Sequence, residues 1–302
     1  MRPGLKDFID LVVPHYLLIT IFGPISAYMI ITGSIPGVAV IPIVLALSFG
    51  ALGFNTINMV FDEKIDRITK PLRPIVRGVI SRKSASIISF LFYFLSLAIS
   101  LSVNFTVFLL MILFFILTFT YSFPRIYYKK YFWASSFCGS IVYGVIPFLA
   151  VQSITSAEFS PHFLMFFFLL YFIISNCKDF EDMSGESMHG IKSIPTVFGA
   201  KKSALIIIFS EFLLLFFTIY SSLVGIIDRK YIFASAVSIL MLLPISWLFW
   251  KDMKKITYRD IAFVSTRNSE LNSIITQSDG VTFSILFAVI VQILFGLVSV
   301  SL

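Results

Sequence analysis

The chain has 302 residues, of which 58% are hydrophobic and 13% are charged, and its formal net charge is +7. A soluble domain carries about 25% charged residues, so a soluble core cannot hide this much apolar surface. The composition excludes a soluble enzyme and predicts a polytopic membrane protein. We expect one transmembrane domain over residues 1–302, because no linker or low-complexity stretch divides the chain.

Nine apolar segments reach or approach the roughly 20 residues that a membrane-spanning helix needs. They lie at about 11–33, 36–61, 84–103, 105–122, 131–152, 160–177, 203–226, 231–250 and 281–301. Only Asn104 separates the third segment from the fourth, but together they are too long for one span, so we expect a tight turn there. The pattern predicts an all-α integral membrane protein with nine transmembrane helices.

Lysine and arginine are distributed unevenly between the two sides that nine spans define. All but two of the 23, Arg229 and Lys230, fall at the N-terminus or in the loops on its side. Positive charge is retained in cytoplasmic loops, so we expect a multi-pass cell-membrane protein with a cytoplasmic N-terminus. The net charge is then mainly a topology signal and gives no argument for nucleic-acid binding.

The first polar motif covers residues 55–78 and begins inside the second apolar segment. Asn58, Asp62 and Asp66 are four residues apart, which places them on one face of a helix, and Asn55 joins that face. Carboxylates beside the apolar part of a membrane helix are costly, and they indicate a functional site. Their oxygens are ligands that Mg²⁺ prefers.

The second polar motif covers residues 176–195, four predicted spans later. Asp179, Asp182 and Glu186 again share one helical face, and Lys178 lies one turn before Asp182. The two motifs hold nearly half of the 16 acidic residues of the chain, and both lie on the predicted cytoplasmic side. We interpret them as two facing helix ends, which together form a weak internal repeat.

Two acidic helix ends with basic loops beside them fit a polyanion that bridges Mg²⁺ ions, and a prenyl diphosphate has such a head and an apolar tail. Mg²⁺ would neutralise charge on the leaving diphosphate. The basic side chains that follow or accompany the motifs are candidates for contact with the phosphate oxygens: Lys70, Arg73, Arg77, Lys178 and Lys192. Loss of diphosphate leaves an allylic cation, which the rings of Tyr121, Tyr143 or Tyr171 are candidates to stabilise.

The first motif, with KPLRPIVRG at 70–78, resembles the first signature of the UbiA superfamily of intramembrane prenyltransferases. KDFEDMSGE at 178–186, followed by GIKSIP at 190–195, looks like the second signature. The resemblance covers nearly the whole chain. It implies nine helices around a central cavity and Mg²⁺-dependent transfer of a polyprenyl group from its diphosphate to an acceptor, with a cytoplasmic active site.

The resemblance assigns roles to residues of both motifs. It implies metal binding by Asn58, Asp62, Asp66, Asp179, Asp182 and Glu186, with Asp62, Asp66, Asp182 and Glu186 as the catalytic set. Glu186 stands where the family usually shows Asp, a change that keeps the charge. Diphosphate binding falls to Asn55, Asn58, Lys70, Arg73, Arg77, Lys178 and Lys192.

The motifs most resemble archaeal-type members that alkylate geranylgeranylglyceryl phosphate, and chlorophyll-synthase-like relatives. We therefore expect geranylgeranyl diphosphate as donor and a lipophilic acceptor in ether-lipid synthesis, with membrane lipid around the protein and no obligate protein partner. The alternatives are an aromatic-acid prenyltransferase of ubiquinone or menaquinone synthesis and, from another class, an ion or metal transporter.

Several other polar residues have simpler interpretations. Lys129 and Lys130 are expected to be anchors at the membrane surface, with a role as ligands as the alternative, and Glu211 is expected to extend to the interface or to bond a neighbouring helix. The loop at about 251–280, with Arg259, Asp260 and Arg267, either contacts the acceptor or is a solvated connector.

Overall fold

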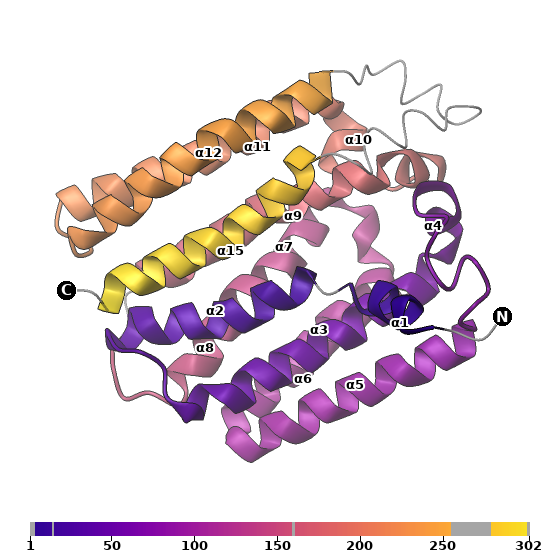
Figure 1. Ribbon diagram of the computed structural model, residues 1–302, viewed down its shortest axis with the longest axis horizontal. Helices are drawn as coiled ribbons and strands as arrows, with labels where there is room; N and C mark the ends of the chain where they lie inside the picture. Colours follow the sequence, from indigo (N-terminus) through magenta and orange to yellow (C-terminus); the bar gives the residue numbers. More distant parts are fainter. Residues whose placement is uncertain (1–3, 14, 159–160, 255–278, 301–302) are drawn as a thin grey trace.

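The computed structural model describes residues 4–13, 15–158, 161–254 and 279–300. These residues form a bundle of long helices that run side by side (Figure 1). Within these ranges there is no strand, and the chain makes a single isolated β-bridge, between Tyr131 and Lys192. The all-α class is confirmed.

Long helices and short connecting helices alternate along the chain. They are α1 (Leu5–Val12), α2 (His15–Thr32), η1 (Val38–Val40), α3 (Ile41–Phe61), α4 (Glu63–Thr69), α5 (Arg82–Val103), α6 (Phe105–Ser122), η2 (Tyr128–Lys130), α7 (Phe132–Gly139), the π-helix η3 (Ser140–Val145), α8 (Ile146–Gln152), α9 (Pro161–Met188), α10 (Ile194–Phe198), α11 (Ala200–Leu223), α12 (Lys230–Lys254) and α15 (Asp279–Val300).

Seven helices in the described part are long and apolar enough to cross a membrane, and an eighth results if α1 and α2 form one span. α1 and α2 meet at a bend of 54°, so the first predicted segment is a helix that starts at His15, preceded by a separate short helix. A shorter apolar helix, Leu286–Val300, lies in α15. The membrane class is confirmed, and the count of nine spans stays a prediction.

Small residues allow the central helix α3 to pack tightly against α5 and α6. A Cβ added at Gly53 would lie 3.0 Å from the ring of Tyr93, and one added at Gly50 would lie 3.0 Å from Phe114. Close approach through small residues is the usual basis of helix packing in a membrane. Large apolar side chains such as Phe94 and Phe209 face outward instead, where lipid would surround them.

Asn104 makes the predicted turn between α5 and α6. Its side-chain oxygen accepts a hydrogen bond from the backbone of Val107 at 2.8 Å, which caps the start of α6. Its amide group donates to Ser153 at the start of the next connection at that end. The prediction of a tight turn at this residue is confirmed.

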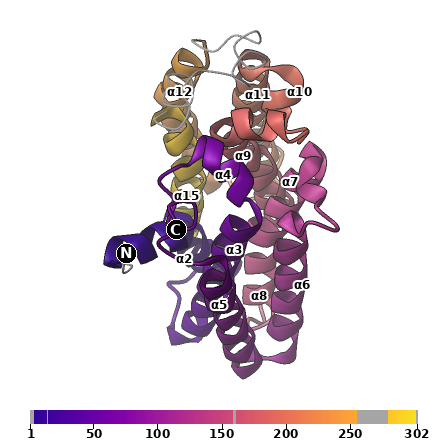
Figure 2. The ribbon, with the colours of Figure 1, turned by 90° about the vertical axis from the view of Figure 1, so that its right-hand side faces the viewer.

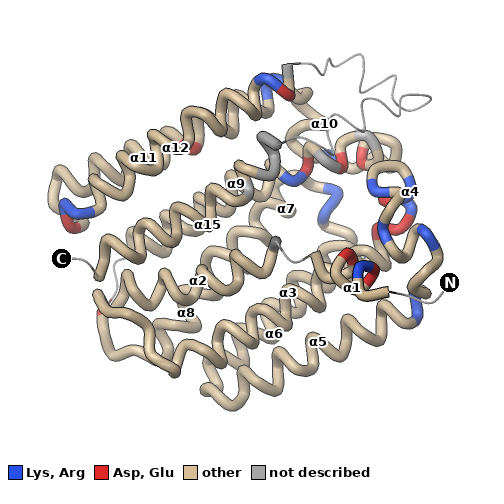
Figure 3. The backbone as a smooth tube through the Cα atoms, in the orientation of Figure 1, with Lys and Arg blue, Asp and Glu red and all other residues tan. Residues whose placement is uncertain are grey.

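Charged residues gather at one end of the bundle, where α1, α4 and α10 lie (Figure 3). The connection from α11 to α12, which includes Asp228 and Arg229 and ends where α12 begins at Lys230, lies at the other end. Seen from the charged end, α4 lies near the centre, between α3 and α9 (Figure 2). The two polar motifs therefore meet at one end of the molecule.

Candidate active site

The first cluster lies where α3 passes into α4. The helix is not continuous as expected, because the backbone bends at Asp62, whose φ of −89° and ψ of 9° lie in the bridge region. Backbone hydrogen bonds from Asp62 to Asn58 and from Asp66 to Asp62 nevertheless continue across the bend. Both carboxylates stay on the inner side, and each residue is only 2% exposed.

The second cluster lies on the last turns of α9, which continues well beyond its apolar part to Met188. Asp179, Asp182 and Glu186 are all buried, which agrees with the predicted common face. α4 packs directly on this face. Thr69 on α4 donates a hydrogen bond to Oδ1 of Asp182 at 3.3 Å.

Gly185 allows this close packing of α4 on α9. A Cβ added there would lie 2.8 Å from Cγ2 of Ile65 and 3.1 Å from the carbonyl oxygen of the same residue. Contacts below 3.0 Å require the neighbour to move. A residue without a side chain at this position therefore lets the two acidic clusters approach each other.

Basic side chains link the two clusters. Lys70, just after α4, places its Nζ 2.7 Å from Oδ1 of Asp182 on α9. Arg73 pairs with Asp66 within the first motif. The structure thus brings these two predicted phosphate ligands into direct contact with the predicted metal ligands.

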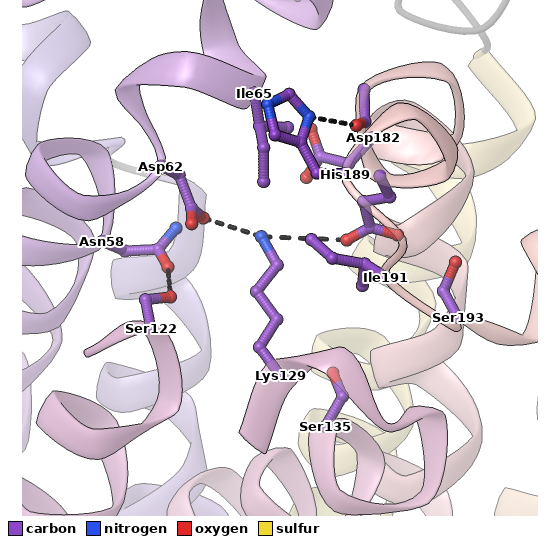
Figure 4. Close-up of polar contacts among 12 residues, drawn as sticks. Asn58, Asp62, Ile65, Ser122, Lys129, Ser135, Asp182, His189, Ile191 and Ser193 are labelled. Atoms are coloured by element: carbon purple, nitrogen blue, oxygen red, sulfur yellow. Dashed lines mark hydrogen bonds and ion pairs between the residues drawn. The ribbon is translucent and has the colours of Figure 1, made fainter. Parts of the chain in front are cut away.

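Lys129 lies between the clusters and is the main residue that the sequence analysis misassigned. Its Nζ is 2.7 Å from Oδ2 of Asp62 and 3.7 Å from Oε1 of Glu186, and the residue is 3% exposed (Figure 4). The expectation of a surface anchor is wrong for Lys129, whereas Lys130 is exposed. The sequence did contain one indication of a role at the site, because this lysine pair lies in a loop on the same predicted side of the membrane as both acidic motifs.

The remaining residues of the first motif have other partners. The side-chain oxygen of Asn58 accepts a hydrogen bond from Ser122 on α6, beside Asp62 (Figure 4). Asn55 donates to the carbonyl oxygen of Val12 at 3.1 Å, and Arg77 pairs with Asp7. Asn55 and Arg77 thus contact α1 in this structure, and their predicted contact with diphosphate stays a prediction.

Two basic residues of the second motif are without an ion pair within the described residues. The Nζ of Lys178 lies 5.4 Å from the centre of the Tyr121 ring. Lys192 is exposed, and its backbone N–H donates to the carbonyl oxygen of Lys130. Tyr121 therefore already presents its ring to a cation beside the clusters. The ring centroids of Tyr143 and Tyr171 lie 6.0 Å apart, and neither buried hydroxyl group has a hydrogen-bond partner in the part of the chain that the structure describes.

Burial and nearby charge act differently on the carboxyl groups at this end. Burial raises the pKa of Asp66 despite its pairing with Arg73. Burial would also raise the pKa of Asp182, but Lys70 and Lys129 outweigh it and hold that pKa well below its usual range. Burial raises the pKa of Glu186 to about 7. Such divergent values in one cluster are typical of a functional site.

The donor set fits Mg²⁺. In the two clusters, three buried carboxylate oxygens have no hydrogen-bond partner among the described residues: Oδ1 of Asp62, Oδ2 of Asp179 and Oε2 of Glu186. No three acidic, histidine or cysteine side chains converge on one point in the part of the chain that the structure describes. This agrees with Mg²⁺, which takes one or two carboxylates and completes its shell with water and substrate phosphate.

Two other candidates lie apart from the clusters. Glu211 is buried in α11, 3% exposed, and its Oε1 has no hydrogen-bond partner among the described residues. The expected bond to a neighbouring helix is therefore not made by this oxygen within the described part of the chain. Most of the loop at 251–280, including Arg259 and Arg267, lies outside the described residues.

The model of the UbiA prenyltransferase family matches residues 16–266. A digeranylgeranylglyceryl phosphate synthase from Thermococcus onnurineus is 31% identical over 203 residues, which cover 67% of this chain and 72% of the relative. The synthase of the same name from Pyrococcus horikoshii is 29% identical over 211 residues, with the same two coverages.

Solved structures have the same fold. A UbiA homologue from Archaeoglobus fulgidus bound to DMAPP and Mg²⁺ aligns with a TM-score of 0.66 at 19% identity, covering 98% of this chain and 99% of that one. A structure described for digeranylgeranylglyceryl phosphate synthase aligns with a TM-score of 0.61 at 23% identity, covering 99% of both chains. The family match covers most of the chain and includes both acidic motifs, so this protein is a prenyltransferase that belongs to the UbiA prenyltransferase family.

Proposed function

We propose that this enzyme transfers a polyprenyl group from a polyprenyl diphosphate to geranylgeranylglyceryl phosphate, with Mg²⁺ as cofactor. The observation that carries the proposal is the pair of facing carboxylate clusters, Asp62 with Asp66 and Asp179 with Asp182 and Glu186. These carboxylates are buried at the end of a membrane bundle and lie among lysine and arginine side chains. The arrangement suits a diphosphate head beside an apolar interior.

The carboxylates of both clusters would hold the metal, with Asn58 beside the first. Bound Mg²⁺ supplies Lewis-acid neutralisation of the charge that develops on the leaving diphosphate. Lys70, Arg73 and Lys129 now pair with carboxylates of the two clusters, from which they can reach phosphate oxygens. Their role is to bind and orient the diphosphate between the two helix ends.

The ring of Tyr121 is the best placed of the three tyrosines to face a cationic reaction centre. It lies beside Lys178, and its hydroxyl group is held by Ser135 at 2.9 Å, so the orientation of the ring is fixed. A cation over an aromatic face is stabilised by the ring quadrupole, and more so where water is excluded. We therefore assign the allylic carbon of the donor to the neighbourhood of this ring.

The acceptor is inferred from the relatives. Several of them are named digeranylgeranylglyceryl phosphate synthase, which indicates ether-lipid synthesis, with geranylgeranyl diphosphate as the expected donor. We infer that the charged end of the bundle faces the cytoplasm, because nearly all of the lysine and arginine residues that the structure describes lie there. Both substrates would then present their charged heads from one side of the membrane.

The experiment uses purified protein in neutral nanodiscs with geranylgeranyl diphosphate and Mg²⁺. It compares geranylgeranylglyceryl phosphate with aromatic acids as acceptors and identifies products by mass. We expect the digeranylgeranyl ether as product, and none after addition of EDTA. Prenylation of an aromatic acid but not of the lipid would instead support the quinone-type alternative.

A further inference from the structure

Two loops meet at the rim of the active site and form a patch of basic and aromatic side chains. We call Lys130, Tyr131, Trp133 and Lys192 the rim patch. The backbone N–H of Lys192 donates to the carbonyl oxygen of Lys130 at 3.0 Å, and an isolated bridge pairs Lys192 with Tyr131. The connection after α6 and the connection after α9 are thereby fixed side by side.

The aromatic part of the rim patch is exposed and ordered by stacking. Tyr131 is 44% exposed and Trp133 is 58% exposed, and their rings stack with centroids 6.1 Å apart at 21°. The Nζ of Lys130 lies 5.0 Å from the centre of the Tyr131 ring. Rings of this kind, apolar in body with a polar edge, lie at the level of lipid headgroups.

The basic part of the rim patch is not used by the acidic clusters. Lys70, Arg73 and Lys129 each pair with a carboxylate of the inner site. Lys130 and Lys192 are exposed, and neither forms an ion pair with a described residue. Two lysines on adjoining backbones therefore stay available for an anion that approaches from outside the clusters.

The rim patch adjoins the inner site through the backbone. Lys130 follows Lys129, whose ammonium group lies between Asp62 and Glu186. Lys192 follows Glu186 by a short turn in which Gly190 has a φ of +69°. An anion held on the patch would therefore lie next to the diphosphate, not at a remote part of the surface.

We infer that the rim patch binds the phosphate headgroup of the lipid acceptor, with Lys130 and Lys192 on the phosphate and the Tyr131–Trp133 pair against the start of the lipid. This inference rests on the proposed function and assigns the acceptor phosphate to residues separate from those that hold the donor diphosphate. Charge complementarity favours a phosphorylated acceptor over a neutral one. The patch is thus a determinant of acceptor specificity.

The test compares Lys130→Gln, Lys192→Gln and the double variant with the wild-type protein in neutral nanodiscs. Lys202→Gln is the matched control, because Lys202 is an exposed lysine at the start of α11, at the same end, and it forms no ion pair with a described residue. Each measurement gives KM for geranylgeranylglyceryl phosphate and, separately, for geranylgeranyl diphosphate. Direct binding of the acceptor lipid is measured alongside, because it does not require turnover.

We expect the acceptor KM to rise by about five- to tenfold in each single variant and further in the double variant, since each removes one charge-assisted contact. The donor KM and the control should stay unchanged. An unchanged acceptor KM and unchanged acceptor binding in the double variant would overturn the inference. So would an equal rise in the donor KM, which would place both lysines on the diphosphate.

Two further measurements distinguish the acceptor phosphate from the phosphate of other anionic lipids, and distinguish failure of this inference from failure of the proposed function. Phosphatidylglycerol added to the nanodiscs should leave the acceptor KM of the wild-type protein unchanged, and competition would make the patch a general anionic-lipid site and overturn the inference. Absence of turnover with the phosphorylated acceptor, with turnover of another acceptor, would overturn the proposed function. The binding comparison would then still decide whether the lysines hold a lipid phosphate.

Discussion

Replacing Gly185 by alanine tests whether the close approach of α4 to α9 is needed to align the two acidic clusters. The new Cβ would lie 2.8 Å from Cγ2 of Ile65 and 3.0 Å from Cγ2 of Thr69. Ordinary carbon contacts are about 3.5 Å or longer, so α4 must move away by about 0.7 Å. The carbonyl oxygen of Ile65, at 3.1 Å, cannot rotate out of the way as a side chain can.

Moving α4 away from α9 would lengthen a hydrogen bond that is already long. The hydrogen bond from Thr69 to Asp182 is 3.3 Å, and a further 0.7 Å would break it. Overpacking of this kind costs about 1–3 kcal/mol, and a misplacement near 1 Å costs about 100-fold in rate. We therefore expect kcat/KM to fall by about 10- to 100-fold. Alanine favours a helix over glycine by about 1 kcal/mol, so α9 itself is not weakened.

The assay measures kcat/KM with geranylgeranyl diphosphate at saturating Mg²⁺, together with the thermal unfolding midpoint. Gly37→Ala is the control, because Gly37 has a φ of −81° and no atom within 4 Å of an added Cβ. The control should stay within about twofold of the wild-type activity. A Gly185→Ala protein that folds and keeps wild-type activity would refute the argument that packing of α4 on α9 aligns the site.

Four further expectations concern the metal and the chemistry. Asp62→Asn or Asp182→Asn should nearly abolish turnover in a folded protein, since the amide keeps the shape and loses the charge; activity within a few-fold in both would contradict the two-cluster site. Lys129→Met should lower the unfolding midpoint of the metal-free protein, because loss of a buried partner costs about 3–5 kcal/mol. Added Mg²⁺ should recover much of that loss, whereas Lys202→Met should change neither state. Because burial raises the pKa of Glu186 to about 7, this group is protonated below that pH and must lose the proton to bind metal. Mg²⁺ titrations should therefore give about tenfold weaker affinity at pH 6 than at pH 8, and Glu186→Gln should flatten that dependence. Finally, a 2-fluoro-prenyl diphosphate should react far more slowly if ionisation precedes bond formation, and a near-normal rate with rate-limiting chemistry would exclude an allylic cation.

The acidic motifs could be predicted from the sequence because their geometry is local. Asp179, Asp182 and Glu186 share a face on any helix, and the structure buries that face. The turn at Asn104 could also be predicted from the sequence. The apolar run is too long for one span, and asparagine, which favours the start of a helix, is the residue that interrupts it. The family followed from the motifs and is confirmed by the match over residues 16–266.

Lys129 was assigned wrongly because its position depends on contacts between distant parts of the chain. Its loop is fixed by the hydrogen bond from Lys192, about 60 residues later, and by the left-handed backbone at Tyr127, whose φ is 44°. The partners of Asn55 and Arg77 depend on α1, which the hydropathy pattern merged into the first span. Local periodicity carries no information about either arrangement.

Two contacts join α1 to the two ends of the first motif. Arg77, near the end of the first motif, pairs with Asp7, and Asn55, at its start, bonds the carbonyl oxygen of Val12. The short helix therefore contacts both ends of the segment that carries Asp62 and Asp66. We expect an affinity tag or truncation at the N-terminus to disturb these contacts and thereby to shift the carboxylates of Asp62 and Asp66, although no described side chain of α1 pairs with either carboxylate.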